Sequence, residues 1–267
     1  QGSSPCRSGC YVRSLRALPL APTFVTSYKM KAFTAVVVAV SAAVSFNSGQ
    51  QPDVRVEMLC TNAGLSKVRR DSFMSRTPPE VLSKVEFAMG VNARQYGGGP
   101  AELLKYQRLV NLTAEQQKNG GSLKTQGHLS SGSLACALGH YSIWQKAAQH
   151  PGWTVVLEDD ASVRPGTDWN KIVNVATSNK KIGFVWLEGR PCGPGWGTAA
   201  YSLSQSFAKK LLKLYKFDKV VDGWLLEDVV PRHLPGVCPK ASDMPFMHGK
   251  DFRDDGLHGG ESEIRSD

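Results

Sequence analysis

The sequence predicts an α/β protein with a mixed, mostly parallel sheet and helices on both faces of that sheet. Residues 153–157 and 182–187 are short runs of mainly aliphatic and aromatic residues, which is typical of strands buried on both faces. A helical pattern over residues 129–149 leads through His150-Pro151-Gly152 directly into the first run. A helix joined to a strand by so tight a turn indicates α/β architecture.

Composition and charge fit a soluble globular protein and exclude two classes of function. The 267 residues suffice for one large α/β domain with additional short segments, and contents of 41% apolar and 21% charged residues are ordinary. The net charge is +9, but residues 1–52 carry five basic residues and no acidic one, which leaves +4 for the remainder. This excess suits anionic small molecules such as nucleotide phosphates, and no nucleic-acid-binding motif accompanies it. We therefore expect no nucleic-acid partner, and the lack of further long apolar segments excludes a membrane structural protein.

Residues 1–52 form a leader that precedes the domain. Met30-Lys31, the apolar residues 32–46 and then Asn47, Ser48 and Gly49 follow the order of a signal peptide. The apolar part is shorter than the about 20 residues of a membrane helix, so a cleaved signal peptide is favoured over a short signal anchor. A hydrophobic first helix of the mature domain is a third reading, and the segment before Met30 could be a transit peptide or non-native sequence. We expect a protein of the secretory pathway (ER or Golgi lumen) or a secreted one, bound to membrane only through such an anchor.

Cysteine usage agrees with a secretory route. Cys6 and Cys10 lie in the leader, and the four other cysteines allow three pairings: Cys60, Cys136, Cys192 and Cys238. None has the C-x-x-C spacing of a structural zinc site, so we expect no structural zinc. Asn111-Leu112-Thr113 is a glycosylation sequon if the chain enters the lumen.

The predicted domain, residues 53–238, begins with a strand and two helical patterns. Residues 53–60 alternate apolar and polar side chains as a strand does, and residues 67–74 form a helix that carries Arg69 and Arg70. These arginines could contact phosphates from the rim of a crevice; solvated surface arginines are the alternative. Pro78-Pro79 introduces a second helical pattern that extends to Met89. Residues 97–100 are a glycine-rich loop without the Lys-Ser/Thr of a phosphate loop.

The helix over residues 129–149 carries the first candidate site residue. Ser130 or Ser131 can cap its N-terminus, and a buried face follows at three- and four-residue steps: Leu134, Ala137, Leu138, Tyr141, Trp144 and Ala148. His140 lies on a neighbouring stripe, which predicts a half-buried side chain. A lone histidine there is more often a core residue than a ligand.

Three carboxylates follow the central strand without a gap. Glu158, Asp159 and Asp160 stand directly after residues 153–157, and in parallel α/β sheets ligands bind beyond the carboxyl ends of the strands. Adjacent acids repel one another, which is tolerable when they are solvated or when a divalent cation lies between them. An acidic turn that caps a helix is the alternative.

The remaining elements repeat the strand–helix pattern. Residues 169–176 form a helix, the strand 182–187 ends at Glu188, and a glycine-rich loop leads to a strand over 198–203. Ser204 caps the next helix, whose lysines form a solvated face. Asp222 lies within the apolar run 220–226, and residues 239–267, with His248 and His258, are a polar, flexible tail.

Four blocks in a fixed order resemble glycosyltransferase family 25, which includes bacterial lipopolysaccharide (LPS) biosynthesis enzymes and procollagen galactosyltransferases. They are LSSGSLACALGHYSIWQKA at 129–147, VVLEDDA at 155–161, GTAAYSLSQSFAKKLL at 197–212 and VVDGWLL at 220–226. The family usually has Gly-Cys and Ser-His where this chain has Ala135-Cys136 and Gly139-His140, and Ser133 stands where an acid is common. The resemblance implies a GT-A fold, which is Rossmann-like, and a nucleotide-sugar donor, a divalent cation and inversion at the anomeric carbon.

The resemblance also implies roles for particular residues. Glu158, Asp159 and Asp160 would hold Mn²⁺ or Mg²⁺ with the donor diphosphate, and Asp222 would be the base, with a helix cap as the alternative reading. His140 would orient the acidic loop. The remaining candidates for substrate binding are Arg69, Arg70 and Glu188. We expect UDP-galactose or UDP-glucose as donor and a glycan or protein as acceptor, hydroxylysine or a lipid-linked saccharide among them.

Two other functions stay open on the sequence alone. One is a secreted, non-catalytic carbohydrate-binding or adhesion module of the same fold, which the altered helix block favours and the complete acidic block disfavours. The other is a metal-dependent phosphatase or nucleotidyl enzyme that uses the same acids, although the sequence has no second metal-binding motif.

Overall fold

The structure is a computed structural model of the chain. It describes residues 51–62, 64–93, 103, 113–114, 131–189, 197–230 and 234–248. The chain divides into two compact units, residues 1–48 and 49–267, and every described residue belongs to the second unit. The predicted signal segment, the sequon at Asn111 and His258 therefore lie outside the described residues.

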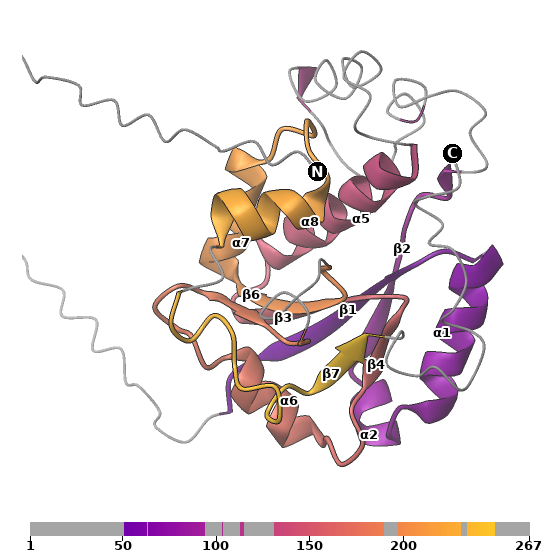
Figure 1. Cartoon of the computed structure of the whole chain (residues 1–267), viewed down its shortest axis with the longest axis vertical. Coiled ribbons are helices and arrows are strands. Elements are labelled where there is room, and N and C mark those ends of the chain that lie inside the picture. Colours follow the sequence, from indigo (N-terminus) through magenta and orange to yellow (C-terminus); the bar gives the residue numbers. More distant parts are fainter. Residues whose placement is uncertain are drawn as a thin grey trace, which may run out of the picture. The chain divides into compact units, whose positions relative to one another are not determined.

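A five-stranded mixed sheet forms the centre of the second unit (Figure 1). Its order is β2-β1-β3-β6-β5, with bounds Val85–Met89, Val54–Cys60, Trp153–Glu158, Ala200–Ser204 and Phe184–Trp186. Strand β1 runs parallel to both β2 and β3, and β6 runs antiparallel to β3 and β5. The mixed, mostly parallel sheet predicted from the sequence is thus confirmed, with β6 as the reversed strand.

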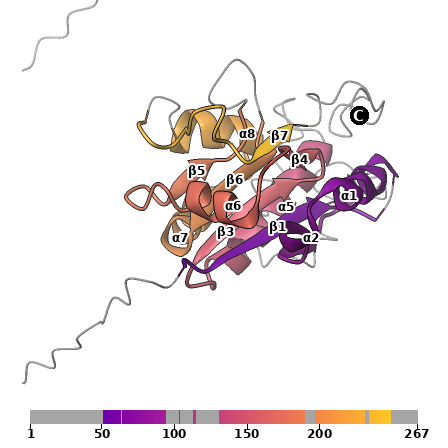
Figure 2. The ribbon, with the colours of Figure 1, turned by 90° about the horizontal axis from the view of Figure 1, so that it is seen from below.

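Helices cover both faces of this sheet (Figure 1), and Figure 2 views the molecule from the side of α6 and α2. On one face lie α5 (Ser131–Ala147), α7 (Gln205–Leu214) and the short α8 (Val221–Trp224), followed by a π-helical turn, η2 (Leu225–Val229). On the other face lie α1 (Gly64–Arg76), α2 (Pro79–Leu82) and α6 (Trp169–Ala176). Ser204 caps α7 as predicted, because its hydroxyl accepts a hydrogen bond from the Phe207 backbone N–H at 3.3 Å.

The alternation of side chains along β3 assigns its residues to two separate cores. Val156 belongs to the core beneath α5 and α7, whereas Val155 and Leu157 belong to the core beneath α1 and α6. All three are fully buried. Because successive side chains of a strand point to opposite faces, the same alternation sets the directions of the acids that follow.

The second helical pattern predicted from the sequence is only partly correct. Helix α2 ends at Leu82, and residues 85–89 form strand β2 instead, pairing with β1 from Val56↔Val85 to Cys60↔Met89. Apolar residues at 81, 82, 85 and 89 fit a helix, but the V-E-F-A-M segment also alternates as an edge strand does. Backbone pairing with β1 decides between these local preferences.

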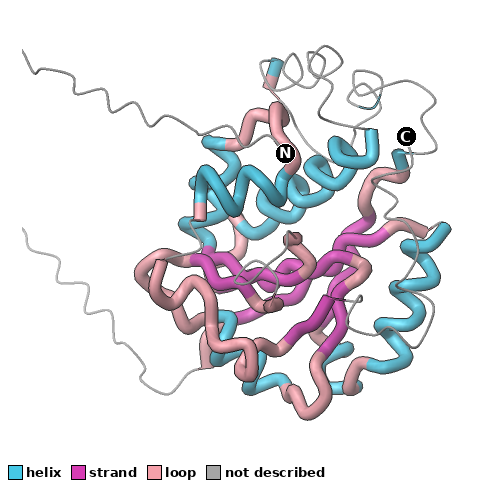
Figure 3. Tube along the Cα trace, in the orientation of Figure 1, coloured by secondary structure: helices cyan, strands magenta, loops and turns pink. Residues whose placement is uncertain are grey.

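A small two-stranded sheet lies beside the main one and changes the expected boundary of the domain (Figure 3). Strand β4 (Ala161–Val163) pairs antiparallel with β7 (Phe246–His248), and Ala161 is the partner of His248. The sequence predicts a flexible tail from residue 239, but Phe246 is fully buried and its backbone N–H donates to the Leu187 carbonyl at 3.2 Å. Burial of this aromatic side chain holds residues 244–248 in the fold.

Two further observations bear on the expected environment of the protein. Cys60 and Cys136 are free thiols, whereas Cys238 is disulfide-bonded. Within the part of the chain that the structure describes, no helix combines the length and the apolar character that a membrane crossing requires.

Candidate active site

A pocket of about 120 Å³ opens at the carboxyl ends of β1 and β3. Glu158, Asp159 and Asp160 all line it, together with Arg69 of α1 and Cys136 of α5. The other lining residues come from the end of β1, the segment after β2 and the first turns of α1 and α5: Leu59, Cys60, Thr61, Ser66, Gly90, Val91, Asn92, Ala93, Gly132 and Ala135. The pocket therefore has the position in which parallel α/β sheets bind ligands.

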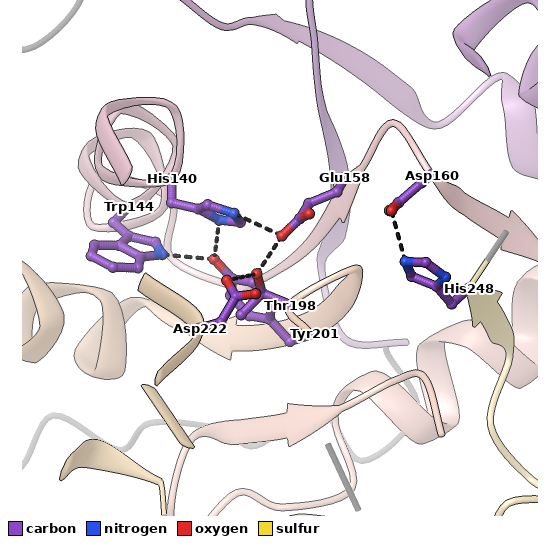
Figure 4. A network of polar contacts seen from close by, with 8 residues as sticks. All are labelled: His140, Trp144, Glu158, Asp160, Thr198, Tyr201, Asp222 and His248. Carbon is purple, nitrogen blue, oxygen red and sulfur yellow. Dashed lines mark hydrogen bonds and ion pairs between the residues drawn. The ribbon is translucent and has the colours of Figure 1, made fainter. Parts of the chain in front are cut away.

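The three acids point in three directions, which follows from the pleat of β3. Glu158 has the same parity as Val156 and faces α5, where it meets His140. Asp159 has the parity of Leu157 and faces α1, where one of its oxygens lies 3.3 Å from Arg69. Asp160, at the turn into β4, lies 2.7 Å from Nε2 of His248. Figure 4 shows Glu158 and Asp160 directed toward these separate partners.

Glu158 ends a buried chain of hydrogen bonds that passes through three aromatic side chains (Figure 4). The indole N–H of Trp144 donates to the Tyr201 hydroxyl at 2.9 Å, and this hydroxyl lies 2.8 Å from Nδ1 of His140. Nε2 of His140 lies 3.1 Å from Oε1 of Glu158. An indole can only donate, so the Tyr201 oxygen accepts from Trp144 and its own proton points to Nδ1. Nε2 then carries the imidazole proton and donates it to Glu158.

Burial holds Tyr201 in the protonated state that this chain of hydrogen bonds requires. Desolvation raises the pKa of the Tyr201 phenol well above its usual value, and the nearby charge of Glu158 acts in the same direction. The phenol is therefore a donor at every physiological pH. His140, fully buried between these partners, holds the Glu158 carboxylate rather than facing solvent.

The hydroxyl of Thr198 links Glu158 to Asp222. It contacts Oε1 of Glu158 and lies 2.7 Å from Oδ1 of Asp222. A hydroxyl has a single proton, so Thr198 can donate to only one of these carboxylates at a time. Burial, followed by the charge of Glu158, raises the pKa of Asp222 to about 6. The two acids and the hydroxyl thus form one coupled group.

Asp222 is not the cap of its helix. Val220 occupies the N-cap position of α8, with no side-chain hydrogen bond, and Asp222 lies one residue inside the helix with its carboxylate turned to Thr198. This geometry disfavours the helix-cap reading of Asp222.

Asp159 and Arg69 form a mostly buried ion pair on the opposite wall of the pocket. Burial, followed by the charge of Asp160, raises the pKa of Asp159 to about 6, although Ser66 and Arg69 act in the opposite direction. The guanidinium of Arg69 is only 10% exposed. A positive charge held this firmly beside a pocket can pair with a phosphate oxygen.

Two of the other candidates lie apart from the pocket. Arg70 contacts Asn62 and Asp71, and its guanidinium lies 5.9 Å from the centroid of the Phe87 ring. Glu188 is fully buried after β5, and neither residue is among the described residues that line the pocket. The structure thus brings together Arg69, the three acids and His140, and places Asp222 next to Glu158 through Thr198.

The structure adds four residues that the sequence does not single out. Trp144, Thr198, Tyr201 and His248 have no motif of their own. Trp144 follows His140 by four residues on α5, and Thr198 and Tyr201 belong to the GTAAYSL block. Such spacings indicate shared faces, but they do not reveal that the side chains meet Glu158 or Asp160.

Gly139 explains how α5 carries His140 so close to the sheet. A Cβ atom at this position would lie 2.5 Å from Cδ1 of Leu59 on β1. A side chain at this position would require the Leu59 side chain to shift, and glycine lets the helix pack against β1 without that shift.

A comparison with protein families identifies the central part of the chain. The family described as glycosyltransferase family 25 (LPS biosynthesis protein) matches residues 104–191. This match supports the resemblance to glycosyltransferase family 25 over that segment. The match supports assignment of the protein as a glycosyltransferase, a class of enzyme that in general uses a nucleotide-sugar donor and an acceptor. No curated protein matches the chain.

The matched segment of this glycosyltransferase contains α5, β3, the acidic residues and β5. Arg69, Thr198, Asp222 and His248 lie outside it. Their connection to the site therefore depends on the geometry described above.

Proposed function

We propose that this glycosyltransferase moves a hexose from a nucleotide-sugar donor to an acceptor hydroxyl, with inversion and with the help of Mn²⁺ or Mg²⁺. The observation that carries the proposal is that Asp159, Asp160 and Arg69 line the pocket at the carboxyl end of β3, with His248 in contact with Asp160. This arrangement joins ligands for a cation to a fixed positive charge, which is what recognition of a diphosphate needs.

The donor set fits a divalent cation. Asp160 and His248 already lie 2.7 Å apart, with Asp159 adjacent in the chain. Carboxylate oxygens suit Mn²⁺ and Mg²⁺, and an imidazole among them favours Mn²⁺, because Mg²⁺ prefers oxygen ligands alone. When bound, the cation would neutralise the charge that develops on the diphosphate leaving group. Arg69 supplies a second positive charge at the same wall of the pocket.

We assign Glu158 a different role from the other two acids. Its Oε1 atom contacts both His140 and Thr198, so this oxygen is directed away from His248 and Asp160. Glu158 then serves to hold Thr198 and Asp222 in place, and His140 acts through Glu158 rather than on the substrate.

Asp222 is the base in this proposal. Inversion in a single displacement requires a group that takes the proton from the acceptor hydroxyl as the new bond forms. A pKa of about 6 leaves the Asp222 carboxylate mostly ionised at neutral pH while it remains a better proton acceptor than an ordinary aspartate. Thr198 fixes one of its oxygens, and the second oxygen is left for the acceptor.

A donor screen tests the proposal. The full chain would be incubated with UDP-, GDP- and CMP-sugars and a set of acceptor hydroxyls, with and without Mn²⁺, and products would be followed by mass shift. We expect transfer from a UDP-hexose, galactose or glucose, only with the cation present, and none from Asp160→Asn. Transfer that is equally fast with Mn²⁺ and with a chelator in place of Mn²⁺ would contradict the metal role.

The disulfide at Cys238 supports our proposal that the chain works in the secretory pathway. Stable disulfides form in oxidising compartments such as the ER lumen and are rare in the cytosol. We expect a tagged full-length chain to be protected from added protease in intact microsomes and digested after detergent. Digestion without detergent would argue for a cytosolic enzyme.

A further inference from the structure

Cys136, His140 and Glu158 converge beside the proposed cation site. Cys136 and His140 are four residues apart on α5 and therefore share a helix face. Glu158 meets this face from the end of β3, with Oε1 at 3.1 Å from Nε2 of His140. One possible ligand atom from each residue (the Cys136 sulfur, a ring nitrogen and a carboxylate oxygen) lies within 4.8 Å of the other two.

We propose that these three residues form a binding site for a thiophilic divalent cation, of which Zn²⁺ is the natural probe. Thiolate, imidazole and carboxylate are the ligands that zinc takes in proteins, and three of them with one open position are typical of sites that exchange ligands. Cys136 and Glu158 both line the pocket, which provides a route from solvent and room for a water molecule as fourth ligand. This site combines residues of a helix face with one at a strand end, so it lacks the C-x-x-C spacing by which structural zinc sites are recognised in a sequence.

The surroundings of His140 fit a metal-binding histidine. A ligating imidazole needs a hydrogen-bond partner for its other nitrogen, and Tyr201, itself held by Trp144, lies 2.8 Å from Nδ1. With a cation on Nε2, the imidazole proton moves to Nδ1. The Tyr201 oxygen then accepts a hydrogen bond from Nδ1–H. The aromatic side chains are fully or almost fully buried, so the ring is oriented before a cation arrives.

Charge around the thiol also favours a cation. Burial raises the pKa of Cys136 well above its usual value, and four carboxylates add to this: Glu158, Asp222, Asp159 and Asp160. These negative charges disfavour the thiolate form of Cys136 when no metal is bound, but they attract a divalent cation. A bound cation then favours the thiolate. On binding, the thiol proton leaves to solvent, while the imidazole proton moves from Nε2 to Nδ1.

The site differs in chemistry from the one proposed for Mn²⁺. A sulfur ligand favours Zn²⁺, Cd²⁺ or Co²⁺, whereas Asp159, Asp160 and His248 offer only oxygen and nitrogen. A cation on Glu158 would draw this carboxylate from Thr198, so we expect Zn²⁺ to inhibit transfer. That consequence depends on the proposed function, whereas the binding itself does not, and binding assays separate the two.

Titration of the full chain with Co²⁺ tests the site, because a thiolate ligand gives a sulfur-to-cobalt charge-transfer absorption. We expect a saturable band with one equivalent that Zn²⁺ abolishes and that a large excess of Mg²⁺ leaves in place. Cys136→Ser should remove the band and weaken Zn²⁺ binding by at least about 100-fold, the upper range found for outer-shell losses. Cys60→Ser is the matched control, because Cys60 is a free thiol that lines the same pocket but lies outside the cluster, and it should keep the band.

A measurement on the unmutated protein guards against misfolding of the Cys136 variant. Alkylation of Cys136 by a maleimide can be followed by peptide mass. Zn²⁺ should slow this reaction by at least about tenfold, the lower end of the effects known for supporting residues of metal sites. Mg²⁺ should not slow it. A band that survives in Cys136→Ser, a band lost in Cys60→Ser, or alkylation of Cys136 unaffected by Zn²⁺ would each overturn the proposal.

Discussion

Nε2 of His248 lies 2.7 Å from Oδ2 of Asp160, although the two residues lie far apart in the sequence. The contact depends on the pairing of β4 with β7, in which His248 stands opposite Ala161, the neighbour of Asp160. Strand β7 thus brings an imidazole to the acidic end of β3. We propose that this imidazole completes the cation site formed by the acidic residues.

Replacement of His248 by glutamine should weaken Mn²⁺ binding. If the imidazole is a ligand, its loss should lower the affinity by about 10- to 100-fold or more, at least the range known for supporting residues of metal sites. Isothermal titration with Mn²⁺ measures this directly. His150→Gln is the matched control, since His150 lies at the opposite end of β3 and contacts only Asp53 among the described ion pairs. Equal Mn²⁺ affinity in the two variants would leave His248 a structural residue.

Asp222→Asn should lower kcat while the KM for the donor changes little. Removal of a general base typically costs about 10²- to 10⁴-fold in rate, and Asp222 does not line the described part of the donor pocket. Steady-state kinetics separates the two parameters. Asp218→Asn, four residues earlier and exposed, should behave as wild type. A large rise in KM with unchanged kcat would place Asp222 in binding instead.

The pH dependence of transfer follows from the raised pKa of the same carboxyl. A base must be ionised, so the rate should rise as pH increases through about 6 and level off above that value. Asp159 titrates in the same region, so both groups contribute to the rise. A rate that falls between pH 5 and about 7 would be inconsistent with a carboxylate base.

Asp222→Asn should also stabilise the fold at neutral pH. The folded-state pKa of Asp222 lies near 6, above the value near 4 expected for an unfolded chain. The folded state therefore binds more protons between these values, and stability falls as pH rises through them. The neutral variant avoids this loss, which is at most about 3 kcal/mol for a shift of about two pKa units. Urea unfolding at pH 8 and pH 4 should show the difference between variant and wild type only at the higher pH.

Tyr201→Phe should destabilise the protein by about 1–3 kcal/mol, because Trp144 and His140 would both lose their buried partner. Chemical denaturation measures the change. Tyr215→Phe offers a control with the same atom removed, since the Tyr215 hydroxyl donates to the Lys219 carbonyl at 2.8 Å in a partly buried position. We expect a cost of about 1 kcal/mol there. Equal effects would show that the chain of hydrogen bonds adds no stability.

The central strand and its acids could be predicted because their signals are local. The apolar run of β3, the turn at Pro151-Gly152 and the three acids are contiguous in sequence, and the alternation of a strand alone predicts that Glu158 and Asp159 face opposite sides. The capping of α7 by Ser204 is likewise a local pattern.

The parts of the site that could not be predicted depend on contacts between distant segments. His248 lies in a polar stretch whose only strand signal is three residues long, and its position follows from pairing with β4. Thr198 lies just before β6 and has no local signal of its own, and only the approach of α8 places Asp222 beside it. Residues 85–89 satisfied two periodicities, and pairing with β1 made them a strand.

The most direct test of a cation held at the end of β3 is titration of the full chain with a UDP-hexose, in the presence and absence of Mn²⁺, for the wild type and for Asp160→Asn. The account predicts that Mn²⁺ tightens nucleotide-sugar binding to the wild type and has no effect on the variant, whose unfolding transition should stay cooperative. Mn²⁺-dependent binding that is equally strong in Asp160→Asn would contradict it.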